Sequence, residues 1–315
     1  MRRTLVVGLA LAVVFTAFAP RAAAVPRPTY TTGDSWTYRR NLTEAFDLKF
    51  SGNTTLEAGA VVPFSIDGVH MDALELYASG GGTFSGAFPG FGSVRGNWTA
   101  TGTDWWEAGS WKMVRSVLRL SADGLLSGGV TAVPVTFELR NDTTARVLDD
   151  GWPWPIPANA TGFVTSRWNT TQNLTVVFGT LPPQYNEIAV TADLTTGYAW
   201  NRTERVTVPA GTFDADVIRE AGPEGGFRLH WYSARAGNDV REEEYNSTGA
   251  KVLTSELTAY HYAAGQPTPG FPWLLVLVAT SAAVVVVLLV VWALRSRQRR
   301  NPIEPWMPPE PPGSS

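Results

Sequence analysis

The chain contains no cysteine in its 315 residues, so no disulfide holds the fold together. A region of about 240 residues is long enough to bury a sufficient core without such bridges. Histidine is also scarce, and its three positions, His70, His230 and His261, lie far apart in the sequence. That spacing does not match a zinc site, and no calcium loop of the EF-hand type is present. We therefore expect no cofactor.

Positive charge is limited as well. Residues 25–270 contain 18 basic and 26 acidic side chains, a formal net charge of −8. A surface with this excess of negative charge repels phosphate backbones. We therefore expect no nucleic-acid partner.

Helical periodicity is missing from the same region, where apolar and polar residues alternate instead. Residues 227–232 alternate at period two, and Gly and Asn mark turns at 234–238 and 246–249 before another strand-like run at 251–260. This alternation predicts antiparallel strands joined by short turns. We predict an all-β region at residues 25–262, with a possible internal boundary at 149–162, where prolines and glycines cluster.

The two ends of the chain differ from this region. Arg2 and Arg3 precede an apolar stretch at residues 5–18, and three alanines at 22–24 supply a small-residue cleavage site. This order is typical of a secretory signal peptide, which we place at residues 1–24.

A second apolar run lies near the C-terminus. Residues 271–294 contain no charged side chain, and at about 1.5 Å per residue a helix of this length spans a hydrocarbon core of roughly 30 Å. Four arginines follow within residues 295–300, so the positive-inside rule places the Pro-rich tail, 295–315, in the cytoplasm. The sequence predicts a single-pass plasma-membrane protein with an external N-terminal domain, a Pro/Gly linker at 263–270 and one transmembrane helix.

Asparagine is concentrated in glycosylation acceptors. Nine of the twelve asparagines stand in Asn-X-Ser/Thr sequons, whereas the Ser and Thr content would give about two by chance. These predict a glycosylated outer surface at Asn41, Asn53, Asn97, Asn141, Asn159, Asn169, Asn173, Asn201 and Asn246.

Pro269, Gly270 and Phe271 stand at the junction with the apolar run, and the arginine cluster follows it. This order resembles the PGF-CTERM sorting signal of archaeal surface proteins. The resemblance implies cleavage near the tripeptide and attachment of the new end to a lipid. The fifteen residues after Arg300 fit a permanent anchor instead, and both alternatives stay open.

Three further segments carry a second resemblance. Residues 33–38 (GDSWTY), 206–220 (VTVPAGTFDADVIRE) and 230–249 (HWYSARAGNDVREEEYNSTG) resemble exported prokaryotic modules related to the LolA-type lipoprotein carriers. The resemblance implies a curved antiparallel sheet, of half-barrel or sandwich type, whose concave face holds acyl chains in the carriers.

One short motif invites a catalytic interpretation. Gly33, Asp34 and Ser35 match the start of a Gly-Asp-Ser esterase block, and Asp67 and His70 have the spacing of that family's Asp and His. Such enzymes need α/β alternation around the serine, which is missing here. We therefore favour a turn closed by the Asp34 side chain and expect no enzyme.

Two pairs of carboxylates lie two residues apart and so share a strand face. Asp214 with Asp216, and Glu242 with Glu244, are weak candidates for calcium ligands. A solvated face is the simpler interpretation, since Phe213, a large apolar residue, would lie on the opposite face.

Residues 79–96 contain seven glycines interleaved with Phe84, Phe88 and Phe91. The segment could be a mobile lip that presents its rings to a lipid or partner. It could also be a glycine-kinked strand whose rings enter the core, which we favour.

Tryptophan is abundant, with 13 residues in the chain, and most of them suit core packing. Trp105, Trp106, Trp152 and Trp154 are expected to be the most exposed because charge or proline surrounds them. Trp152 and Trp154 are therefore candidate stacking platforms for a glycan.

These observations favour a non-enzymatic, glycosylated, archaeal cell-surface protein that binds a ligand or contributes to the cell envelope. Two alternatives remain open: a carrier of lipid or another hydrophobic molecule, and a glycan-binding module. Neither the ligand nor the oligomeric state follows from the sequence.

Overall fold

The computed structural model describes residues 24–43, 48–88, 92–128, 132–222 and 225–264. Its twelve strands are β1 (Ser35–Thr43), β2 (Lys49–Ile66), β3 (Val69–Phe88), β4 (Gly92–Glu107), β5 (Met113–Ser127), β6 (Val133–Asp150), β7 (Thr161–Phe178), β8 (Gln184–Val208), β9 (Gly211–Ala221), β10 (Phe227–Ser233), β11 (Asn238–Tyr245) and β12 (Lys251–His261). Because these residues contain no helix, the all-β prediction is confirmed for this part of the chain.

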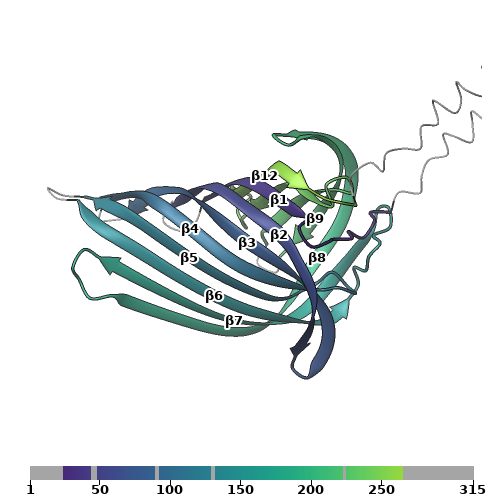
Figure 1. Cartoon of the computed structure of the whole chain (residues 1–315), viewed down its shortest axis with the longest axis horizontal. Helices are drawn as coiled ribbons and strands as arrows, with labels where there is room; N and C mark the ends of the chain where they lie inside the picture. The colour runs from purple at the N-terminus through teal and green to yellow at the C-terminus, as the bar shows by residue number, and fades with distance from the viewer. Residues whose placement is uncertain (1–23, 44–47, 89–91, 129–131, 223–224, 265–315) are drawn as a thin grey trace, which may run out of the picture. The chain divides into compact units, whose positions relative to one another are not determined.

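The strands form one closed antiparallel barrel (Figure 1). Each strand pairs with its chain neighbours, and β12 pairs with β1 from Ser35↔His261 to Leu42↔Leu253. The expected half-barrel or sandwich is therefore corrected to a closed barrel. Local alternation predicts strands but does not report whether the first and last strands of a sheet meet. The segment at residues 149–162 joins β6 and β7, which pair directly, so it lies within one sheet.

The two faces of the barrel wall differ in chemistry. Directly paired residues share a face, so one inner ring can be followed through Arg40, Gly52, Gly82, Trp98, Ala122, Phe137 and Val176. The adjacent outer ring runs through Arg39, Asn53, Gly81, Thr99, Ser121, Glu138 and Thr175. The inner ring is largely apolar and the outer ring is polar, which is the alternation that an antiparallel sheet with one solvated face requires.

Three hydrophobic clusters make up the core. One gathers around Trp36, Tyr38 and Leu257, and a second contains Phe84 and Trp98. The third includes residues 25, 152 and 156, where the N-terminal segment meets the β6–β7 loop. There the backbones of residues 25 and 156 exchange two hydrogen bonds, of 2.8 and 3.1 Å.

Paired glycines allow neighbouring strands to approach closely at two places. Gly52 faces Gly82 across β2 and β3, and Gly96 faces Gly124 across β4 and β5. A Cβ atom on Gly82 would lie 2.0 Å from the carbonyl oxygen of Ser51. Only glycine permits such a close backbone approach. Residues 79–88 therefore belong to β3 and residues 92–96 to β4, and the ring of Phe84, only 3 % exposed, enters the core as the kinked-strand prediction expects.

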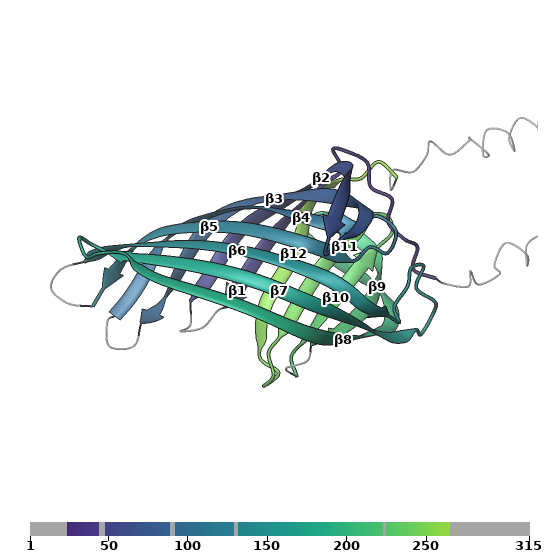
Figure 2. The same ribbon diagram turned by 90° about the horizontal axis from the view of Figure 1, so that it is seen from below.

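β8 has one edge that is only partly paired. It pairs with β7 from Gln184 onward, but its pairing with β9 begins at Gly197. The long strands β5 to β8 extend beyond the shorter strands β9 to β12 (Figure 2). Residues 184–196 consequently have no described partner strand on the β9 side.

The chain divides into two compact units, residues 1–266 and 267–315, and the barrel belongs to the first. Within the described ranges, no helix is both long and apolar enough to cross a membrane. The predicted signal peptide up to residue 23, the linker from residue 265, the transmembrane helix and the tail lie outside the described residues. So do Pro269, Gly270 and Phe271.

Candidate functional site

The inner face of the barrel over β2 to β7 forms an apolar wall. It consists of Phe50, Phe84, Trp98, Leu120, Phe137, Leu139, Leu174 and Val176. The ring centroid of Phe84 lies 5.7 Å from that of Phe50 and 5.9 Å from that of Phe137. Phe84 and Trp98 are buried, whereas Leu174 and Val176 are only partly covered.

The apolar wall continues onto β8, where its side chains are exposed to solvent. Ile188 and Val190 pair with Gln172 and Thr170 of β7 and therefore share the inner face. Their side chains are 44 % and 51 % exposed. Large aliphatic side chains on an inner face are normally covered, so this part of the barrel presents apolar surface to solvent.

The inner face of β9 to β11 carries charge instead. The inner charged cluster consists of Glu220, Arg228, His230, Asp239, Glu242 and Glu244. His230 Nδ1 lies 2.7 Å from Asp239 Oδ2, and its Nε2 lies 3.2 Å from Glu220 Oε2. Arg228 lies 3.1 Å from Glu242 Oε1 and 2.8 Å from Glu244 Oε2.

These contacts shift the pKa values in the cluster. Burial opposes the charged form of His230, but the facing carboxylates of Asp239 and Glu220 outweigh it and raise the pKa of the imidazole well above 6.5. Burial likewise opposes the carboxylate of Glu220, yet His230 and Arg228 hold its pKa below the usual value. The two carboxylates therefore favour the protonated form of the His230 imidazole.

This geometry makes the cluster a structural ion-pair network. A general base needs a free imidazole nitrogen within reach of the proton that it removes. Both nitrogens of His230 face carboxylates instead. The network links β9, β10 and β11 across the inner face.

A polar belt crosses the inner face of β4 to β7. Asp104, Ser116, Thr143 and Thr170 are directly paired in that order, and burial raises the pKa of Asp104. Among the described residues, the buried polar atoms of the inner face without a hydrogen-bond partner include Arg40 Nε, Asn141 Oδ1 and Ser255 Oγ. Buried polar atoms usually find a partner, so the middle of the barrel suits a polar group as well as an apolar one.

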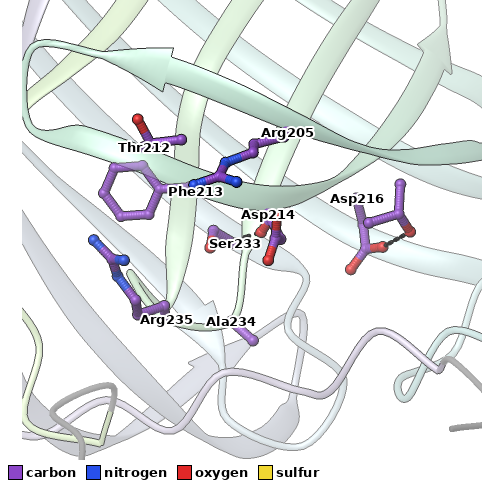
Figure 3. A pocket seen from close by; sticks show the side chains of 9 residues that line it. Arg205, Thr212, Phe213, Asp214, Asp216, Ser233, Ala234 and Arg235 are labelled. Atoms are coloured by element: carbon purple, nitrogen blue, oxygen red, sulfur yellow. Dashed lines mark hydrogen bonds between the residues drawn. The ribbon is translucent and has the colours of Figure 1, made fainter. Parts of the chain in front are cut away.

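The first pair of candidate carboxylates lies in a hollow of about 370 Å³ at the β8–β9 hairpin (Figure 3). Asp216 accepts a 2.7 Å hydrogen bond from Thr203, and Asp214 is exposed, as a solvated face predicts. Arg205 and Arg235 line the same hollow. Their positive charge opposes a cation, and no group of metal-binding side chains is found among the described residues.

The second pair of candidate carboxylates does not form the expected solvated face. Glu242 and Glu244 both contact Arg228 on the inner face, and the Glu242 side chain is only 16 % exposed. Their spacing correctly places them on one face of a strand. The correction arises because barrel closure turns that face inward, which the local sequence does not reveal.

Asp34 and Ser35 do not form a catalytic site with His70. Asp34 is 1 % exposed, and its carboxylate accepts hydrogen bonds from the backbone amides of Thr31 and Ala263. Ser35 pairs with Glu57 of β2, and the turn containing Asp67 lies ten residues further along the chain. That separation corresponds to about 30 Å of strand. The predicted turn closed by the Asp34 side chain is confirmed.

The tryptophans are less exposed than expected. Trp152 is 5 % exposed and stacks on Tyr198 at 5.6 Å, while Trp154 is partly buried against Tyr232. Trp105 and Trp106 are also partly buried. The expected exposure of Trp152 is wrong because the proline-rich loop packs against the N-terminal segment rather than standing in solvent.

The remaining aromatic candidates are only partly described. Phe84 belongs to the apolar wall and borders a second hollow of about 550 Å³ over β3 to β5. Phe88 ends β3 and Phe91 lies outside the described residues, so neither side chain has a described position.

The glycosylation acceptors separate by face. Seven of the nine are exposed: Asn41, Asn53, Asn97, Asn159, Asn173, Asn201 and Asn246. Asn169 is partly buried and accepts a hydrogen bond from Thr191. Asn141 differs, because it pairs with Leu118 and Gln172 on the inner face and its Oδ1 is buried.

Comparison of the chain with protein-family models, with curated proteins and with solved structures gives no match. The functional argument therefore depends on the residues and geometry of this chain.

Proposed function

We propose that the chain is a non-enzymatic, glycosylated cell-surface protein whose barrel holds an apolar molecule, such as a lipid acyl chain, on its inner face. The observation that carries this proposal is the solvent-exposed part of the apolar wall on β8. Ile188 and Val190 face the inside of the barrel and yet remain about half exposed. A bound acyl chain would remove this surface from water, at roughly 25 cal/mol per Å².

The partly paired edge of β8 supplies an entrance to the inner face. No described strand pairs with residues 184–196 on the β9 side of β8. The inner face can therefore be reached past this edge. Ligand sites are typically apolar, with a few placed polar groups. Here the polar belt would receive a polar head group, together with Asn141 Oδ1 and Ser255 Oγ, two buried atoms that have no hydrogen-bond partner among the described residues.

The polarity of the outer face supports a location of the barrel in water outside the cell. The outer ring from Arg39 to Thr175 is polar, and seven sequon asparagines are exposed. The signal-peptide pattern and the apolar run at 271–294 support export and membrane attachment. The charged cluster supports a non-enzymatic role, because His230 is held between two carboxylates.

Native mass spectrometry of the full chain, gently extracted from its own membrane, tests the proposal. We expect a lipid-sized adduct on the unmodified protein. Leu174→Lys places a charge on the inner face and should reduce the adduct at least tenfold. Thr175→Lys is the matched control, since the neighbouring side chain lies on the outer face opposite Glu138 and Tyr185 and the adduct should persist.

Circular dichroism of both variants verifies that the barrel is retained. A bare protein mass in the unmodified chain would overturn the proposal. Equal loss of the adduct in the two folded variants would also overturn it, because lipid bound to the inner face responds to inner-face charge alone. The same spectra would show whether the chain is cut near Pro269.

A further inference from the structure

The partly unpaired edge of β8 is a long template for strand addition. Residues 184–196 pair with β7 on one side, and no described strand pairs with them on the other. Each strand edge presents a row of backbone donors and acceptors, and natural proteins usually protect it with lysine, proline, bulges or a covering element. Here the pairing with β7 is continuous over this stretch and shows no bulge.

The edge also carries little chemical protection. It contains no lysine or proline, and its charged residues are Glu187 and Asp193. Tyr185, Ile188 and Val190 are 78 %, 44 % and 51 % exposed. Exposed apolar side chains grouped on an open edge indicate a surface that another strand covers.

We infer that this edge pairs with the same edge of a second copy of the chain, so that two barrels join through antiparallel β8–β8 pairing. A two-fold axis perpendicular to the sheet makes the paired strands antiparallel, which is the geometry of every pair in the barrel. It also places residues of the same face opposite each other, so the inner faces of the two copies become continuous.

The charges of the edge limit the possible registers. A two-fold axis at Val190 would set Glu187 against Asp193 twice, and an axis at Glu187 or Asp193 would oppose identical charges, which is destabilising. An axis at Ala189 avoids these contacts. It sets Ile188 of each copy against Val190 of the other, so that these side chains form one continuous apolar surface on the inner faces of the two copies. The edge is therefore self-complementary in an apolar register that has no like-charge contacts.

Cysteine scanning of the full chain in its own membrane tests this pairing. The chain has no native cysteine, so a single substitution supplies the only thiol. Directly opposed residues in an antiparallel pair lie about 4.5–5.5 Å apart at Cα, within disulfide range, whereas residues offset by two positions lie beyond about 7 Å. Substitution at each position from 187 to 191 should therefore give a cross-linked dimer predominantly with Ala189→Cys.

Thr171→Cys is the matched control, because Thr171 pairs directly with Ala189 on β7, inside the sheet. It should stay monomeric on a non-reducing gel. A maximum at Ala189 that falls on both sides supports the pairing. Absence of cross-linked dimer at all five positions, or equal cross-linking of Thr171→Cys, would overturn it. The result is separate from the lipid experiment, since a dimer can form without a bound lipid and a monomer can carry one.

Discussion

His230 shows how one side chain acquires its role from the closed barrel. It occupies an inner position of β10, between Asp239 of β11 and Glu220 of β9. In isolation a histidine in a strand pattern is a polar residue of no assigned function. Only the pairing of three strands brings two carboxylates to its ring, and their charge raises the pKa of the imidazole, with 19 % of the side chain exposed.

Replacement of His230 should therefore destabilise the barrel in a pH-dependent way. We expect His230→Gln to lower the free energy of unfolding by about 3 kcal/mol near pH 6, as for removal of one partner of a buried ion pair. The pKa of His230 is raised, so its contribution is fully present below its unfolded pKa of about 6.5 and is lost as pH rises through the folded value. The contribution of Glu220, whose pKa is lowered, is lost instead as pH falls through its folded pKa.

Urea unfolding at a series of pH values measures this effect. The difference between the unmodified chain and His230→Gln should be largest between about pH 5 and 6.5 and should shrink at higher pH. His70→Gln is the control, because His70 is exposed beside the β2–β3 turn. A difference independent of pH would contradict the ion-pair account of His230.

Strand pairs explain why β3 and β4 contain so much glycine. Gly82 faces Gly52 on the inner face, and Phe84 packs where a side chain on Gly96 would stand, 2.7 Å from the added Cβ. The sequence predicted a glycine-kinked strand with rings in the core. It did not predict that glycines would face one another, since that depends on the register of two strands.

Gly82→Ala should destabilise the β2–β3 pair. Its Cβ would lie 2.0 Å from the Ser51 oxygen and 2.6 Å from Gly52 Cα, both backbone atoms, so we expect a loss of about 3 kcal/mol. Amide hydrogen exchange should show faster exchange in β2 and β3 than in β10 and β11. Gly109→Ala is the control, because no atom lies within 4 Å of its added Cβ. Equal stability of the two variants would contradict the tight approach at Gly82.

At the level of the whole molecule, the sequence predicted the class of fold but not its closure. Alternation, turns and the absence of helical periodicity predicted antiparallel β structure. The inward direction of Glu242 and the burial of Trp152 depend on barrel closure and on the contact of residue 25 with residue 156, which no local pattern encodes. The proposed apolar site was accordingly anticipated as a concave sheet face, whereas the charged cluster was not anticipated.

The division between inner and outer faces makes one prediction for all nine sequons. Glycans need a solvated acceptor, so we expect them only among the eight asparagines other than Asn141. Asn141 lies between Leu118 and Gln172 on the inner face, and its amide donates a 3.4 Å hydrogen bond to Thr143, the threonine of its own sequon.

Glycopeptide mapping of the protein from its own membrane should find Asn141 unmodified. Asn141→Gln should leave the total glycan mass unchanged, whereas Asn173→Gln, on the neighbouring strand but facing outward, should remove one glycan. A glycan on Asn141 would contradict the assignment of the faces, and a chain without glycans would contradict the predicted glycoprotein. Glycans found only on the outward-facing asparagines would show that the polar face of the barrel is exposed to solvent and that the apolar face lies inside.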